Sequence, residues 1–169
     1  MRYPLIRPAH LIQPKNLHWQ IIADHLMPDE REHWCAMAGA SSYNPEVAAV
    51  GFINTPGARF VLVDEYGQPV MGGGAVNLRG GCWDLWMSCT PSAWASHWRS
   101  VTKSCRWLIG EIFNNGGTRV QITTLLSRKH ATDWYERALG MSRDGILRHA
   151  GAHGEDLVMY SRINEGVTR

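Results

Sequence analysis

The tyrosine at position 135 is the side chain of this sequence best placed to meet a group in transfer. It lies in the stretch Ala131 to His149, A-T-D-W-Y-E-R-A-L-G-M-S-R-D-G-I-L-R-H, which predicts a helix, a tight turn at Gly140 and a strand. The apolar residues before the turn recur at the spacing of one helical face, and glycine commonly ends a helix by turning the chain back. Tyr135 therefore either reaches a transferred group or packs as an ordinary core tyrosine.

The carboxylate of Asp84 is the second candidate, and a strand positions it. The segment from Cys82 to Cys89 predicts a strand, whose side chains alternate between two faces. Leu85 and Met87 look like a surface on which helices pack, so Asp84 lies on the opposite face. A carboxylate is a natural proton acceptor, although a solvated strand acid explains Asp84 equally well.

Tryptophan is unusually abundant, with eight residues in the chain. Five of them lie in one region that is predicted to run from a strand into a helix: Trp83, Trp86, Trp94, Trp98 and Trp107. They either build a bulky core, because indole buries a large apolar area, or line a ligand groove as a stacking surface.

Composition limits the classes of protein that remain. With 169 residues the chain is long enough for one domain with a genuine core, so we expect a single domain over residues 1–169. The net charge of +2 and the lack of a Lys/Arg run argue against nucleic-acid binding. No apolar run approaches the ~20 residues of a membrane helix, and the N-terminus lacks a signal-peptide core. We expect a cytoplasmic protein that binds neither nucleic acid nor membrane.

Cysteine and histidine spacing argues against a metal site. The four cysteines lack C-x-x-C spacing, and the eight histidines include no H-E-x-x-H motif. We expect no bound metal. We expect free and mostly buried thiols at Cys35, Cys82, Cys89 and Cys105.

The elements that must position Tyr135 and Asp84 follow from periodicity and from helix and strand end signals. Three helices are predicted near the N-terminus, and the second should carry Trp34, Met37 and Ala38 on its inner side. The predicted order is a strand at Tyr3–Arg7, helices from Pro14 to about Leu26, from Pro28 and from Pro45, strands at Arg59–Asp64, Pro69–Leu78 and Cys82–Cys89, one long helix from Pro91 to Ile112, a strand at Thr118–Leu126, the helix before Gly140, and strands at Met141–His149 and Asp156–Ile163. This order predicts an α+β domain with a mixed sheet.

This order, with W-Y-E-R-A-L-G-M, R-D-G-I-L-R-H and D-L-V-M-Y-S-R, resembles the GNAT superfamily of acetyl-CoA-dependent N-acetyltransferases, most clearly from about Phe60 to Ile163. The resemblance implies a mixed, mostly antiparallel central sheet flanked by helices. In that family the parallel fourth and fifth strands splay apart, and the pantetheine arm of acetyl-CoA lies between them. Those strands fall on Cys82–Cys89 and Thr118–Leu126.

The resemblance also implies roles for individual residues. Tyr135 takes the place of the family's acid, which protonates the departing thiolate. Asp84 is then the candidate base that takes the proton from the attacking amine. Backbone groups of Met87, Ser88 and Cys89 would pair with the pantetheine amides.

One departure from the family pattern concerns the phosphate-binding loop. The usual Gln/Arg-x-x-Gly-x-Gly/Ala is replaced by W-A-S-H-W-R, which contains no glycine. Phosphate contacts would then come from His97, Trp98, Arg99 and Ser100, with Arg99 forming charge-assisted bonds. Arg128 stands where the family often carries an asparagine, seven residues before the tyrosine.

A narrower resemblance joins D-E-R-E-H-W, G-Q-P-V-M-G-G-G, G-C-W-D-L-W and H-W-R-S-V to GNAT-like proteins of tailed bacteriophages. Some of these are similar to podophage internal virion proteins, and they tend to lack the glycine loop.

Two functions follow as expectations. The first is an N-acyltransferase that moves an acetyl group from acetyl-CoA to a small-molecule or protein amine. The second is a catalytically silent, virion-associated module that binds phage structural proteins; a homodimer is open in both cases.

Overall fold

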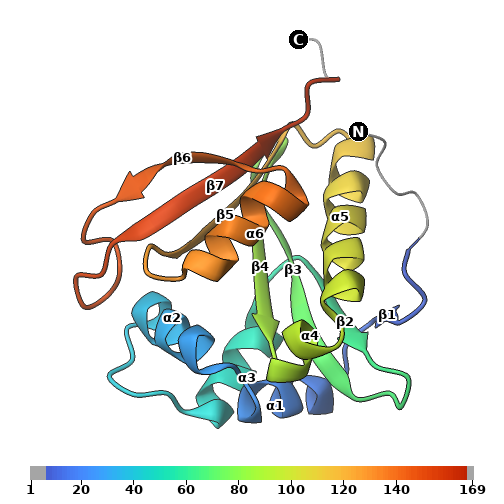
Figure 1. Cartoon of the computed structure of the whole chain (residues 1–169), viewed down its shortest axis with the longest axis vertical. Coiled ribbons are helices and arrows are strands. Elements are labelled where there is room, and N and C mark those ends of the chain that lie inside the picture. The colour runs from blue at the N-terminus through green and yellow to red at the C-terminus, as the bar shows by residue number, and fades with distance from the viewer. Residues whose placement is uncertain (1–6, 167–169) are drawn as a thin grey trace.

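Seven strands form one sheet in the order β1-β2-β3-β4-β5-β7-β6 (Figure 1), in a computed structural model that describes residues 7–166. Within the described residues only the neighbours β4 and β5 run parallel. The predicted α+β class with a mixed, mostly antiparallel sheet is therefore confirmed. The strands are β1 (Leu11–Ile12), β2 (Ala58–Val63), β3 (Pro69–Arg79), β4 (Cys82–Cys89), β5 (Arg119–Leu125), β6 (Ser142–Leu147) and β7 (Leu157–Ile163).

Helices cover both faces of the sheet, and alternate residues of β2 show this directly (Figure 1). Leu62 packs in a cluster with Val101 of one helix, whereas the preceding Val61 packs with Trp19 and Phe52 on the other face. The helices are α1 (Asn16–Asp24), α2 (Pro28–Ala38), α3 (Pro45–Asn54), α4 (Pro91–Ala95), α5 (Trp98–Asn114) and α6 (Lys129–Leu139). Thus α1 and α3 lie on one face, and α4, α5 and α6 on the other.

Two predictions of secondary structure are not confirmed. One concerns the first strand, which lies mostly outside the described residues, and the other concerns the long helix after Thr90. Tyr3–Ile6 of the predicted first strand lies outside the described residues, while Arg7 is not in a strand. The first described strand is the short β1, which pairs with β2 and carried no clear sequence pattern. The predicted single helix after Thr90 is wrong, because Ser96 (φ −131°) and His97 (φ −119°) leave helical geometry and divide α4 from α5.

The predicted inner side of α2 is not packed in the core at two of its three residues, although all three line one cavity. Met37 is 52% exposed and Ala38 is exposed, whereas Glu30 and Ala36 are the buried residues of this helix. The reason is that α2 does not lie flat on the sheet. It lies over the end of β5, where Ala36 packs against apolar residues of β5 and β7.

The parallel strands β4 and β5 diverge after three paired positions. Pairing joins Cys82 to Arg119 and ends where Asp84 meets Gln121. Beyond that point β4 remains paired with β3 and β5 with β7. We call the space between the unpaired halves, residues 85–89 of β4 and 122–125 of β5, the wedge. The splay expected of these two strands is therefore present.

A glycine of β3 fixes how closely α1 approaches the sheet. A Cβ atom at Gly72 would lie 2.2 Å from the Cζ3 atom of Trp19, a distance that real Cβ atoms do not show. The missing side chain lets the Trp19 indole lie on the strand, where it packs against Trp86 at a ring-centroid distance of 5.6 Å. This contact holds Trp86, which belongs to the unpaired half of β4 that borders the wedge.

Candidate active site

A cavity of about 670 Å³ opens beside the wedge, between α2, α3 and the strands β4 and β5. Its volume falls in the range of small-molecule sites. It is lined by five of the predicted catalytic and cofactor-binding residues: Asp84, Met87, Ser88, Arg128 and Tyr135. A second, more open cavity of about 1090 Å³ lies between α2, the end of β5 and the β6–β7 connection, and none of the predicted residues lines it.

Tyr135 is almost fully buried, with 3% of its surface exposed. Its ring lies 5.7 Å from the Trp134 ring and 5.8 Å from the Tyr160 ring. Burial raises the pKa of the phenol above its ordinary value, and the nearby Arg128 opposes this only in part. The hydroxyl is therefore protonated at neutral pH, which is the state that a proton donor needs.

Asp84 sits at the apex of the wedge, at the last paired position of β4. Its carboxylate accepts a weak hydrogen bond of 3.4 Å from the Gln121 amide. Burial raises its pKa, and the Gln121 hydrogen bond partly offsets that effect. A carboxylate with a raised pKa is a better proton acceptor than an exposed one.

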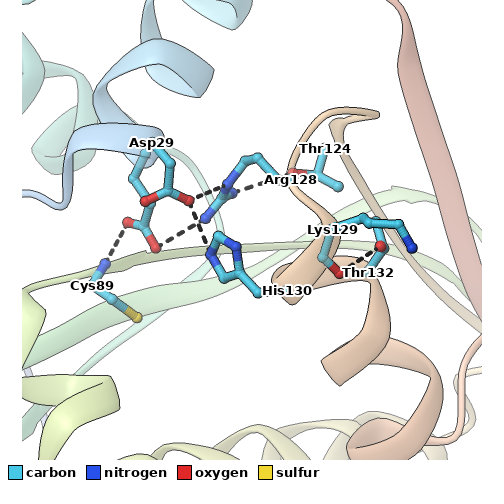
Figure 2. Close-up of polar contacts among 8 residues, drawn as sticks. Asp29, Cys89, Thr124, Arg128, Lys129, His130 and Thr132 are labelled. Carbon is cyan, nitrogen blue, oxygen red and sulfur yellow. Dashed lines mark hydrogen bonds and ion pairs between the residues drawn. The ribbon is translucent and has the colours of Figure 1, made fainter.

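A buried ion pair spans the wedge from one splayed strand to the other (Figure 2). The Cys89 backbone N–H of β4 donates to Glu30 Oε2 at 2.6 Å. Arg128 Nη2 donates to Glu30 Oε1 at 3.3 Å, and Arg128 Nη1 donates to Thr124 Oγ1 of β5 at 3.2 Å. We call Glu30 and Arg128 together the wedge bridge.

Two further side chains extend the wedge bridge toward the surface. Arg128 Nε donates to Asp29 Oδ2 at 2.8 Å, and His130 Nε2 lies 3.1 Å from the same oxygen (Figure 2). Arg128 thus serves two carboxylates at once. Glu30 is 3% exposed, and burial raises its pKa to about 7 although Arg128 and the Cys89 N–H act in the opposite direction.

Solved structures of acetyltransferases share the fold of this chain. The chain is 17% identical to a GNAT superfamily phosphinothricin acetyltransferase from Sinorhizobium meliloti in complex with acetyl-CoA, with a TM-score of 0.69 over 94% of this chain and 91% of that chain. A GNAT-family acetyltransferase from Bacillus anthracis gives 13% identity and a TM-score of 0.70, over 92% of this chain and 94% of that one. The chain is 15% identical to the ribosomal-protein-alanine N-acetyltransferase of Brucella melitensis, with a TM-score of 0.68 over 90% of this chain and 98% of that chain. The chain has the GNAT fold.

At these identities the likeness carries the fold and no more. The sequence matches no protein-family model and no curated protein sequence. Within residues 7–166, no group of three or more His, Cys, Asp or Glu side chains is arranged to hold a metal ion. None of the described helices is both long and apolar enough to cross a membrane.

The GNAT fold places the predicted phosphate-binding residues away from the cavity of Tyr135. His97, Trp98, Arg99 and Ser100 lie at the start of α5 and line neither of the two cavities. The Arg99 guanidinium lies over the Trp98 ring, 4.7 Å from its centroid. Arg99 and Ser100 are exposed, so both can still reach a phosphate in solvent.

Indole rings join α4, α5 and α6 between this segment and Tyr135. The rings of Trp94 and Trp134 meet edge to face at 5.1 Å, and Trp134 Nε1 donates to Thr102 Oγ1 at 3.0 Å. The tryptophans of this region therefore lie in different surroundings. Trp107 is 7% exposed and belongs to the core, Trp98 is 46% exposed, and Trp86 lines the cavity.

The predicted backbone contact at Cys89 meets a competitor within the protein. Its N–H donates to Glu30, and its C=O accepts from the Met27 N–H at 3.2 Å. A pantetheine amide can pair with the Cys89 N–H only after Glu30 moves. Ser88 is 8% exposed and Met87 lines the cavity, so these two positions remain next to it.

Sequence reasoning missed Asp29 and Glu30 as site residues. Both lie in the first turn of α2, where carboxylates favour the positive end of the helix dipole, and this accounts for them without a site. The one sequence signal that distinguishes Glu30 is its position on the side of α2 that also carries Trp34. Nothing in the sequence indicates its pairing with Arg128, 98 residues away.

One buried and one half-buried group of α2 should shift the pH dependence of stability in opposite directions. Burial raises the pKa of Glu30 from 4.5 to about 7, so its contribution to stability is lost as pH rises from about 4.5 to 7. Burial, aided by Arg128, lowers the pKa of His33 from 6.5 to about 4, so its contribution is lost as pH falls from about 6.5 to 4. Each effect is on the order of 3 kcal/mol.

We therefore expect Glu30→Gln to raise the slope of unfolding free energy against pH relative to the wild type, and His33→Asn to lower it. Urea denaturation at half-unit steps from pH 4 to 7 measures both slopes. If both variants show the same slope of unfolding free energy against pH as the wild type, neither group titrates as the structure indicates.

Proposed function

We propose that the protein transfers an acyl group from a coenzyme A thioester to an amine. The observation that carries this proposal is that the phenol of Tyr135 and the carboxylate of Asp84 line one cavity beside the wedge. The thioester supplies the activated acyl group. Asp84 accepts the proton that the attacking amine gives up, and Tyr135 donates a proton to the departing thiolate.

The donors around the wedge suit the carbonyl end of such a thioester. The Cys89 N–H and the Arg128 guanidinium both point at the oxygens of the Glu30 carboxylate. A carboxylate oxygen and a carbonyl oxygen accept the same hydrogen bonds, so Glu30 stands in for the acceptor that a ligand would bring. Arg99 and Ser100, exposed at the start of α5, are the residues proposed to contact the phosphates.

Calorimetric titration with acetyl-CoA tests this function. We expect saturable binding, weakened by Arg99→Gln and unchanged by Arg143→Gln, which removes an exposed arginine of β6 that does not line the cavity. A folded sample that takes up no acetyl-CoA at millimolar concentration would rule out the proposed activity.

The alternative function is a module that keeps the GNAT fold without catalysis and binds a partner, such as a phage structural protein or a second copy of this chain. The observation that favours it is the wedge bridge, which occupies the Cys89 N–H and joins both splayed strands. This alternative predicts no acetyl-CoA binding even when Glu30 is replaced by alanine. Binding by Glu30→Ala alone would instead identify a thioester site that the wedge bridge closes.

A further inference from the structure

The cavity beside the wedge carries a carboxylate that no cation among residues 7–166 neutralises. Asp84 is hydrogen-bonded to Gln121, and within residues 7–166 no Lys, Arg or His forms an ion pair with it. The cation that lines the cavity, Arg128, already contacts two carboxylates, Asp29 and Glu30. The lining therefore has an excess of negative charge, which favours a cationic ligand.

Aromatic side chains stand next to this carboxylate. Asp84 and Trp86 are two residues apart on β4, so their side chains lie on the same face about 7 Å apart along the strand. Phe52 stacks on the Trp86 ring at a centroid distance of 6.0 Å and an interplanar angle of 13°. Both rings line the cavity, together with Trp34 of α2.

The combination of an unneutralised carboxylate and adjacent rings suits one ligand chemistry. An ammonium group gains a charge-assisted hydrogen bond from a carboxylate and an attraction to the face of an indole ring. Apolar residues make up most of the remaining lining, among them Met37, Ile122 and Leu157. A polycation such as a polyamine would place its second charge against these apolar side chains, at a desolvation cost.

We propose that the acceptor is a small aromatic amine, cationic in solution, whose ammonium group binds Asp84 and whose ring lies among Trp34, Phe52 and Trp86. This inference rests on the proposed acyl transfer for its biological meaning, because Tyr135 lines the same cavity. It concerns binding of the acceptor alone, which needs no acyl donor.

Calorimetry without any acyl donor tests the inference, with tryptamine as the probe. Tryptophol is the matched ligand, since it has the same ring and chain length but a hydroxyl in place of the ammonium group. We expect tryptamine to bind the wild type at least about tenfold more tightly than tryptophol, the ratio expected for one hydrogen bond to a charged group. Equal affinities for the two ligands, or tighter binding of spermidine than of tryptamine, would overturn the proposal.

A pair of variants assigns the discrimination to Asp84. Asp84→Asn should bring the affinities for tryptamine and tryptophol within about twofold of each other, because the charge is gone while the shape is kept. Asp133→Asn removes an exposed carboxylate of α6 and should keep the wild-type ratio. A wild-type ratio in Asp84→Asn would refute the assignment. Because no acyl donor is present, failure of tryptamine to bind as expected would not change the result of the acetyl-CoA titration. Failure to bind acetyl-CoA would likewise not change the result with tryptamine.

Discussion

Replacing Arg128 with methionine should lower the free energy of unfolding by about 3–5 kcal/mol, the usual result of removing one partner of a buried ion pair. Glu30 would be left 3% exposed without the cation that pairs with it, and Asp29 would keep only its contact with His130. The link from Glu30 to Thr124 of β5 would be lost as well. Guanidinium denaturation followed by tryptophan fluorescence measures the loss, with the eight tryptophans as the reporter.

Two further variants control this result. Arg143→Met removes an exposed arginine of β6 and should change stability by no more than about 0.5 kcal/mol. Arg128→Met combined with Glu30→Gln should be more stable than Arg128→Met alone, because a neutral amide oxygen still accepts the Cys89 N–H without a buried charge. Equal stabilities of Arg128→Met and Arg143→Met would contradict a structural role for the wedge bridge.

Tyr135→Phe should reduce acyl-transfer turnover by about 10²–10⁴-fold, the range expected when a positioned proton donor is removed. The ring and its contacts with Trp134 and Tyr160 remain, so folding should be kept. Release of free thiol from acetyl-CoA in the presence of tryptamine measures turnover. The loss should fall on kcat and leave the affinity for acetyl-CoA nearly unchanged.

The control for this variant is Tyr66→Phe, which removes the hydroxyl of a tyrosine that is 81% exposed. It should keep wild-type turnover. If Tyr135→Phe also keeps full turnover while remaining folded, the phenol is a core side chain and the proton must come from another group or from water.

The wedge bridge couples the position proposed for the thioester with the cavity proposed for the acceptor. Glu30 belongs to α2, and the same helix contributes Trp34 and Met37 to the cavity of the acceptor. A ligand that takes the Cys89 N–H must displace the Glu30 carboxylate and so perturb α2. Occupation of the thioester position and the shape of the acceptor cavity are therefore linked through one helix.

Local pattern in the sequence was sufficient for most elements of the fold. The Asn44 cap accepts the Val47 N–H at 3.1 Å, as expected of asparagine before a first-turn proline. Gly140 ends α6 in the left-handed conformation that glycine adopts without strain. The alternation of β4 placed Asp84 and Trp86 on one face. Each of these features depends on residues within one turn or one strand of each other, where backbone geometry dictates the outcome.

The tertiary structure alone decided what closes the wedge. Glu30 meets the Cys89 N–H 59 residues along the chain, and Arg128 meets Asp29 over 99 residues. Helical periodicity places Glu30 on the side of α2 that carries Trp34, but it cannot indicate that a distant arginine and a free backbone N–H converge on the carboxylate. Likewise, Met37 and Ala38 fit an apolar helix face, but they are exposed because α2 crosses the end of β5 instead of lying on the sheet. The sequence thus determined strands β2 to β7, the helix ends at Asn44 and Gly140 and the position of Tyr135, whereas long-range packing determined which charges share the site.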